Sequence, residues 1–330
     1  MSSCCICYTT DPGYLLPSFV SAIQARRHTS VPKTDVAIYS FGANARIEQA
    51  FDRACQAEGI QFVPVSLEVI DGASAMLARL FLDRYVASDY DQFLYIDGDT
   101  QITGSLDPLI GYDVPKGQFL AASDPLTFAI PGQAKHDRDI SDYFASLGIS
   151  PGEALKYFNT GVLRINRDGW EALGSAAWSA FQTQQTPSRF PDQDVLNIVG
   201  AGQRVAMSLA WNFPIFLCNG GVEEIIQPRI YHFMGSPKPW HGTFLPWSSE
   251  RYQPYLEIIQ KYPELADYLP VMPRWKKFRY VLQQQYKKRL ETATWRNSNK
   301  RLRILNYEDS FTAGADGLPP VCNVQTTGVI

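Results

Sequence analysis

Short apolar runs alternate with longer amphipathic stretches through the first hundred residues. The short runs are rich in β-branched and aromatic residues, and in the longer stretches apolar residues recur every three or four positions. This pattern predicts strands over "CCICYT", "VAIYS", "IQFVPV" and "QFLYI", separated by helices at 14–28, 45–57 and 75–88. The third helix would bury one face made of Met76, Leu77, Leu80, Phe81 and Tyr85. Such alternation predicts an α/β fold with a parallel, helix-covered sheet.

The second half of the chain is less regular, without internal repeats. Two further strands are predicted by "YFNTGVLRIN" at 157–166 and "RIYHFM" at 229–234. Helical patterns cover 168–183 and 192–201.

Charge separates the C-terminal part from the rest. Residues 274–303 hold eleven Lys or Arg and one acid, Glu291, which makes this stretch +10 in a chain of net charge −3 and leaves −13 for the remainder. A segment rich in Pro and aromatic residues, 245–270, precedes it. We therefore expect a main domain at 1–245 and a C-terminal extension at 246–330.

Composition is typical of a soluble globular protein. With 330 residues and 45% hydrophobic content, the chain can bury a sizeable core. Its apolar runs are shorter than the roughly 20 residues that span a bilayer, and "MSSCCICYTT" does not resemble a signal peptide, so we expect a cytoplasmic location. Six cysteines are too few for a disulfide scaffold, and Cys4, Cys5 and Cys7 are better explained as buried thiols of the first strand than as metal ligands.

Two aspartates, Asp97 and Asp99, directly follow the strand "QFLYI". Carboxylates this close repel each other unless a cation lies between them, which favours a divalent metal. A solvated tight turn is the alternative, because Asp and Gly also suit reversals. Open α/β sheets bind ligands beyond the carboxyl ends of their strands, and these aspartates lie at such an end.

Other carboxylate motifs do not fit this stretch. An EF-hand loop from Asp97 would need Gly and Glu where the chain has Ile102 and Pro108. Phosphatases with an aspartyl nucleophile usually carry a small Thr or Val at the position of Gln101. Neither GxGxxG nor GxxxxGK[ST] occurs at a suitable place, so a metal would have to hold the phosphates of any bound nucleotide.

A second cluster, "YHFMGSPKPWH" at 231–241, supplies complementary chemistry. His232 at a strand end can give a neutral imidazole to a metal. Gly235 lets the backbone approach a ligand, and Lys238 offers a compact positive charge that suits phosphate oxygens. Together with the two aspartates, these residues predict a divalent-metal site that also binds a diphosphate.

Four motifs now stand in one order: Asp97-Gly98-Asp99, "YFNTGVLRINRDGW", "PDQDVLN" and "HFMGSPKPWH". In order and spacing they resemble glycosyltransferase family 8, which includes bacterial lipooligosaccharide and lipopolysaccharide galactosyl- and glucosyltransferases and glycogenin. The resemblance covers about residues 4–245. It implies a GT-A type fold, in which a Rossmann-like mixed sheet is flanked by helices, followed here by a basic, mainly helical extension.

The resemblance also implies roles for individual residues. Asp97, Asp99 and His232 match the manganese ligands of the family, with magnesium as the alternative. Gly235 and Lys238 match its diphosphate contacts.

Further matches concern the donor. Asp11 and Tyr14 lie where the family holds uridine, although "TTDPGYLLP" departs from the usual pattern there. Arg79 matches an arginine that reaches the donor sugar and phosphate. Alternatively, Arg79 lies on a solvent-exposed helix face and has no role in the site. The residues matching those around the donor sugar are Asn159, Asp192 and Gln193. Asn159 could instead be a strand-edge polar residue, and Asp192 could be a helix N-cap.

The reaction implied is transfer of a hexose, galactose or glucose, from a UDP-sugar to a glycan or glycolipid hydroxyl with retention. The candidate catalytic residues are Asp192, Gln193 and Lys238. Because Gln193 is a poor nucleophile, front-face attack is favoured over double displacement, which the sequence leaves open.

Three other functions compete with this one. A glycogenin-like protein would glucosylate itself. A sugar-phosphate nucleotidylyltransferase would need a glycine-rich basic first loop, which "TTDPGY" is not. A binding protein on a decayed scaffold would lack a metal ligand, whereas all three are present.

The basic segment 274–305 predicts an amphipathic helix. Its apolar stripe consists of Trp275, Phe278, Leu282, Tyr286 and Leu290, and its cations lie mostly elsewhere. Nucleic acid is disfavoured as a partner, because the body is acidic and no recognition motif is present. Either the stripe packs on the catalytic domain, or the helix lies on the inner face of a membrane with its cations on anionic lipid.

Overall fold

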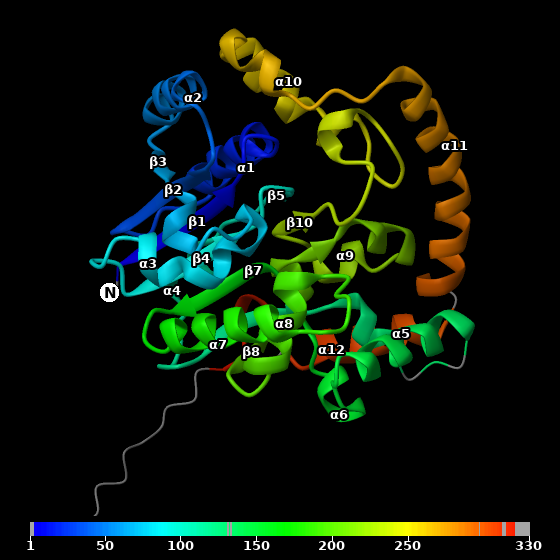
Figure 1. Cartoon of the computed structure of the whole chain (residues 1–330). Coiled ribbons are helices and arrows are strands. Elements are labelled where there is room, and N and C mark those ends of the chain that lie inside the picture. Colours follow the sequence, from blue (N-terminus) through cyan, green and yellow to red (C-terminus); the bar gives the residue numbers. More distant parts are fainter. Residues whose placement is uncertain (1–2, 131, 133, 297, 312–314, 321–330) are drawn as a thin grey trace, which may run out of the picture.

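The computed structural model describes residues 3–130, 132, 134–296, 298–311 and 315–320. A seven-stranded sheet with the order β3-β2-β1-β4-β7-β6-β8 forms the centre of the molecule (Figure 1). Its strands are β1 (Cys4–Thr10), β2 (Thr34–Phe41), β3 (Gln61–Val65), β4 (Gln92–Ile96), β6 (Phe119–Ser123), β7 (Phe158–Asn166) and β8 (Arg204–Met207). The helices are α1 (Leu15–Arg27), α2 (Ala45–Ala57), α3 (Leu82–Tyr85), α4 (Asp107–Gly111), α5 (Lys135–Ser146), α6 (Pro151–Ala154), α7 (Trp170–Thr183), α8 (Pro191–Gly200), α9 (Glu223–Ile226), α10 (Gln253–Lys261), α11 (Arg274–Glu291) and α12 (Asn299–Asp309).

The direction of one strand corrects the expectation of a parallel sheet. Strands β1 to β4 pair in parallel, but β7 runs antiparallel to both β4 and β6. Almost every residue of β7 is buried, including the polar Asn159, Thr160 and Arg164, so its pattern carries no signal of strand direction. The mixed sheet implied by the family resemblance is therefore confirmed.

Strand β1 shows how the sheet divides two cores. Ile6 and Tyr8 belong to the core that includes α1 and α2, whereas Cys5 and Cys7 belong to the opposite core with α7 and α8. This alternation follows from the two-residue period of a strand. The thiols of β1 are free and buried, as the sequence predicted.

The helix expected at 75–88 takes a different form. A 3-10 helix spans Ala75–Phe81 and continues into the single turn of α3. With three residues per turn, Leu77 and Leu80 share the buried side, while Met76 is exposed. Close packing accounts for the buried side, because a Cβ on Gly174 of α7 would lie 1.9 Å from the carbonyl oxygen of Leu80.

A small second sheet with the order β5-β10-β9 lies at the carboxyl end of β4. It consists of β5 (Thr100–Ile102), β10 (Ile230–His232) and β9 (Phe213–Pro214). Pairing of β10 with β5 sets His232 opposite Thr100. A residue far along the chain is thereby brought beside the turn that follows β4.

The C-terminal segments pack in two different ways. Ile304 of α12 is fully buried in the core that also contains Ile6, and Tyr255 of α10 belongs to the same core. The predicted continuous helix over 274–305 is wrong, because a π-helical turn at Thr292–Arg296 separates α11 from α12.

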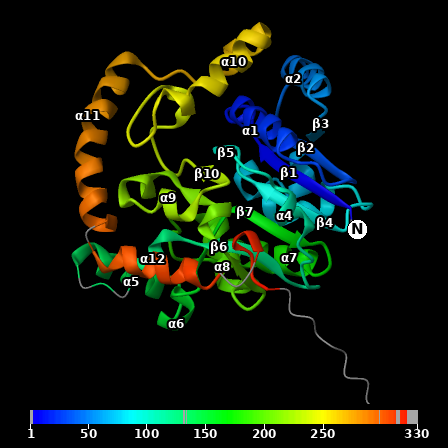
Figure 2. The same ribbon diagram turned by 180° about the vertical axis from the view of Figure 1, so that it is seen from behind.

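Helix α11 exposes the stripe that could have packed on the rest of the molecule. Trp275 is 66% exposed and Tyr286 69% exposed. The side of α11 facing the body carries Gln284, which is buried, and Tyr280, which is partly buried. Figure 2 shows the helix along the edge of the molecule, seen from behind. Within the described part of the chain, no helix combines the length and apolar character required to cross a bilayer.

Candidate active site

The turn after β4 is fixed by its neighbours. A Cβ on Gly98 would lie 2.1 Å from the Ser18 hydroxyl of α1, so only glycine fits there. The backbone amide of Phe233 donates to the carbonyl oxygen of Asp99 at 2.9 Å. This contact joins the turn to the end of β10 and presents Asp97 and Asp99 toward the imidazole that precedes Phe233.

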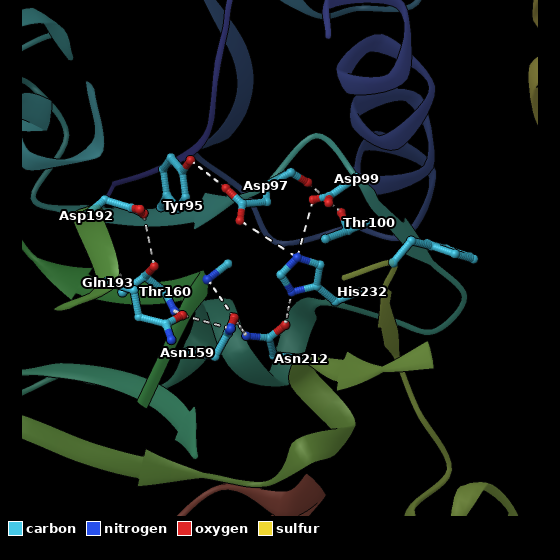
Figure 3. A network of polar contacts seen from close by, with 12 residues as sticks. Tyr95, Asp97, Asp99, Thr100, Asn159, Thr160, Asp192, Gln193, Asn212 and His232 are labelled. Carbon is cyan, nitrogen blue, oxygen red and sulfur yellow. Dashed lines mark hydrogen bonds and ion pairs between the residues drawn. The ribbon is translucent and has the colours of Figure 1, made fainter. Parts of the chain in front are cut away.

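The three predicted metal ligands come together (Figure 3). His232 Nε2 lies 3.3 Å from Asp99 Oδ1 and 3.8 Å from Asp97 Oδ2. One ligand atom from each residue lies within 4.8 Å of the other two. Two carboxylates and an imidazole in this arrangement could hold a divalent metal.

Hydrogen bonds behind His232 select the tautomer that a metal needs. The amide oxygen of Asn212 can only accept, so the contact of 2.8 Å with His232 Nδ1 places the proton on Nδ1. Nε2 is then free to bind a cation between the carboxylates. Asn212 is itself oriented by donating to Asn159 Oδ1 at 2.8 Å. Gly161 lies under the ring, where a Cβ would approach His232 Cε1 to 2.3 Å.

One oxygen of the Asp97 carboxylate, Oδ1, already accepts two hydrogen bonds from the protein. Asp97 Oδ1 accepts hydrogen bonds from Tyr95 at 2.7 Å and from Arg79 at 2.8 Å, which leaves Oδ2 facing His232. Arg79 is buried, pairs with Asp192 at 3.0 Å and donates to Thr160. Burial acts to lower the pKa of Arg79, but Asp192 and Asp97 outweigh it and raise that pKa.

These contacts exclude two alternative interpretations, a solvent-exposed position for Arg79 and a helix N-cap for Asp192. Arg79 is not on a solvated helix face, and Asp192 does not cap α8, whose N-cap is Phe190. Both side chains instead form one ion-pair network with Asp97.

Lys238 pairs with the other aspartate. Its ammonium donates to Asp99 Oδ2 and, at 2.8 Å, to the carbonyl oxygen of Phe233. Burial alone would raise the pKa of Asp99, yet Lys238 and His232 lower it well below its usual range. Gly235, three residues before Lys238, has a φ of +79°, which favours glycine.

Gln193 and Asn159 share a buried network. Gln193 Nε2 donates to Asp124 and Tyr157, both at 3.1 Å, and its Oε1 accepts from Asn159 at 2.9 Å and from the amide of Thr160 at 3.3 Å. Asn159 Nδ2 also donates to Asp124 at 3.1 Å. Burial raises the pKa of Asp124. The amide of Gln193 is therefore held at both ends.

Asp11 and Tyr14 lie at the carboxyl end of β1. The Asp11 carboxylate accepts from the amides of Gly13 and Tyr14 at 2.8 and 3.2 Å, which shapes the start of α1. The Tyr14 ring is 41% exposed and meets the Trp240 ring edge-on at 5.4 Å. An accessible aromatic face remains at this edge of the sheet.

Sequence reasoning missed three residues of the site. Asp124 could have been found, because it follows the buried strand β6 as Asp97 follows β4. Tyr95 could also have been found, because it stands two residues before Asp97 and residues two apart in an extended chain lie on the same side. Asn212 had no local signal, since its role arises only from packing against His232.

Comparison with known proteins decides the family. The sequence profile described as "Glycosyl transferase family 8" matches residues 5–243. The chain belongs to glycosyl transferase family 8. The match spans the sheet, the carboxylate turn and the cluster around His232.

Family 8 relatives include lipopolysaccharide enzymes. The chain is 28% identical over 173 residues to lipopolysaccharide glucosyltransferase WaaO of Escherichia coli (strain K12), covering 48% of each. It is 26% identical to the lipopolysaccharide 1,3-galactosyltransferase of Salmonella typhimurium, again over 48% of each. The chain thus spans about half the length of the curated relatives it matches.

Solved structures support the GT-A fold. Galactosyltransferase LgtC, in complex with donor and acceptor sugar analogues, matches with a TM-score of 0.56 and 22% identity over 82% of this chain and 98% of that one. The WbbM bifunctional glycosyltransferase matches with a TM-score of 0.62 and 18% identity over 81% of this chain and 51% of that one. The mixed sheet with flanking helices is therefore that of GT-A glycosyltransferases.

Proposed function

We propose that the chain is a metal-dependent, retaining hexosyltransferase that moves galactose or glucose from a UDP-sugar to a hydroxyl of a glycan or glycolipid. The convergence of Asp97, Asp99 and His232 carries this proposal. The names of the lipopolysaccharide relatives support the hexose and the acceptor class.

The donor set suits Mn²⁺ better than Mg²⁺. Asp97 offers one free oxygen and His232 a nitrogen, whereas Mg²⁺ prefers an all-oxygen octahedron. The ion would place positive charge beside the diphosphate as it leaves. Asn212 fits this assignment, because it holds His232 in the tautomer that can act as a ligand.

Gly235 and Lys238 are suited to the diphosphate. The ammonium of Lys238 is buried beside Asp99, and it would exchange that bond for one to a phosphate oxygen when the donor binds. Charge on the leaving diphosphate grows during the reaction, so a cation placed there stabilises the transition state more than the ground state. We assign uridine to the exposed ring of Tyr14 and the nearby Asp11.

The buried polar network would bind and orient the donor hexose. Asn159 and Asp192 lie around Gln193, whose amide uses both its oxygen and its nitrogen in hydrogen bonds. An amide oxygen held in this way is a poor nucleophile, which favours front-face attack by the acceptor hydroxyl. We assign Arg79 to holding Asp97 and Asp192 in place beside the donor.

Helix α11 leads us to propose peripheral association with an anionic membrane. Its stripe, from Trp275 to Leu290, is exposed while seven Lys or Arg of the same helix supply positive charge. Aromatic side chains suit the headgroup region, and each cation near an anionic surface contributes roughly 1 kcal/mol. This arrangement would keep a lipid-borne acceptor near the donor site.

A donor screen tests the proposed reaction. The protein is incubated with UDP-galactose, UDP-glucose, UDP-N-acetylglucosamine or UDP-glucuronate, with Mn²⁺ or with EDTA, and UDP release is measured. We expect release from one of the first two donors, only when metal is present. Intact-mass measurement on the same samples detects self-glucosylation. Absence of UDP release from all four donors, or equal release in EDTA, would contradict the proposal.

A further inference from the structure

An open groove lies between helix α11 and the segment that follows β10. Its volume is about 740 Å³. Ser236 forms one wall, and the other wall is made by side chains of α11: Arg279, Tyr280, Leu282 and Gln283. None of these five residues belongs to the site described above.

One wall of the groove belongs to the same loop as the proposed diphosphate contacts. Ser236 directly follows Gly235 and stands two residues before Lys238. Helix α11 is held against the same segment, because the Tyr280 and Phe244 rings lie 6.4 Å apart. Both views of the whole chain place α11 beside this segment (Figures 1 and 2). The groove and the proposed diphosphate contacts therefore share one short loop, Gly235 to Lys238.

Both walls come from stretches without acidic residues. Neither residues 232–249 nor residues 274–290 contain an Asp or Glu. The exposed guanidinium of Arg279 lies over the Trp275 and Tyr280 rings, at 5.6 and 5.5 Å. Among the described residues, no acid forms an ion pair with Arg279. The groove thus carries a fixed positive charge that nothing in the described chain neutralises.

We propose that this groove is a subsite for an anionic group, a phosphate or carboxylate, on the acceptor saccharide. Arginine presents planar paired donors that match such groups, and the Tyr280 ring, which also lines the groove, suits the apolar face of a sugar. The inference rests on the proposed function, since it assigns the groove to the acceptor of that reaction.

The groove also borders the exposed stripe of α11. Leu282 belongs to both, so the stripe and the groove meet along one side of the helix. An acceptor anchored in a membrane that contacts the stripe would present its saccharide along this groove. The anionic group would be held near Arg279 while the terminal sugar reaches the donor.

The test uses galactose 6-phosphate as probe and neutral galactose as control. The full chain is saturated with UDP and Mg²⁺, which avoids paramagnetic broadening, and the indole signal of Trp275 is followed by NMR, assigned with Trp275→Phe. We expect galactose 6-phosphate to shift this signal saturably and galactose to leave it unchanged. Arg279→Gln should weaken the apparent affinity about fivefold or more. Arg289→Gln, an exposed cation on the same helix outside the groove, should not.

Two results would overturn the proposal. One is a Trp275 signal that does not respond to galactose 6-phosphate, or responds equally in Arg279→Gln. The other is a shift produced by UDP alone that depends on Arg279, which would make the donor the source of the anion. Binding of UDP is measured beforehand by calorimetry. If UDP does not bind, the proposed function is contradicted. The titration with galactose 6-phosphate can then be run without UDP, so the subsite is tested separately.

Discussion

Around the end of β4, polar side chains are paired and largely buried, whereas along α11 aromatic side chains are exposed. Asp97, Asp99 and His232 are oriented by contacts within the chain, down to the proton on one imidazole nitrogen. The side chains of Trp275 and Tyr286 are largely exposed to solvent. The first region can be explained from inside the molecule. Contacts within the described chain do not explain the second, which we propose to bind a membrane.

The largest effect is expected from the paired region. Asp99→Asn removes the charge that faces His232 and holds Lys238, so metal affinity should fall at least a hundredfold and UDP release should be lost. Mn²⁺ binding measured by electron paramagnetic resonance and UDP release check both. Asp35→Asn, which alters a carboxylate of β2 outside the site, is the control. Unchanged metal affinity in Asp99→Asn would remove the basis for the metal site.

Replacing Lys238 separates binding from catalysis. Lys238→Met keeps the length of the side chain but removes its charge, so kcat should fall about a hundredfold while KM for the donor changes little. Lys238→Arg, which keeps a charge, should recover part of the rate. Steady-state kinetics of UDP release decide the question. A rise in donor KM alone would make Lys238 an ordinary binding residue.

A smaller loss is expected from a residue that does not touch the metal. Asn212→Ala removes the acceptor for His232 Nδ1, and the proton can then move to Nε2. Metal affinity should fall about ten- to a hundredfold. Asn212→Asp retains the acceptor and should stay closer to the wild type. If Asn212→Ala binds Mn²⁺ as well as the wild type, the tautomer argument is wrong.

The smallest effect concerns α11. Phe278→Ser combined with Tyr286→Ser should reduce co-sedimentation with vesicles containing phosphatidylglycerol several-fold, without changing the Tm or UDP release. Leu155→Ser with Ile225→Ser, two exposed apolar residues outside α11, is the matched control. Point variants are preferred to truncation, because Ile304 of α12 is buried in the core. Equal sedimentation of both double variants would exclude a membrane role for the stripe.

The sequence predicted most of what depends on local patterns. The strand and helix alternation, the carboxylates after β4 and the cluster at His232 were visible because each is a local feature of chemistry or periodicity. The direction of β7 was not, since a strand buried on both faces shows no pattern that distinguishes the two directions. The 3-10 helix at Ala75–Phe81 was missed because its buried side is set by packing on α7.

The polar residues that orient the site also show what local sequence patterns cannot predict. Asn212 acts through His232, a contact that no local pattern indicates, so only the fold reveals it. Asp124 did carry a local signal, its place directly after the buried strand β6, which was not used. The stripe of α11 was recognised from its spacing, but the sequence could not say whether it packs inward. The structure answers that question, because the body-facing side of α11 carries Tyr280 and Gln284 instead.

Calorimetric titration of UDP into the metal-free and the Mn²⁺-loaded protein tests whether the three ligands bind the donor through a metal. If Asp97, Asp99 and His232 hold an ion that orders the diphosphate, UDP should bind strongly only in the presence of Mn²⁺, and His232→Ala should abolish the dependence on metal. Equal UDP affinity with and without Mn²⁺ in the wild type would contradict the account.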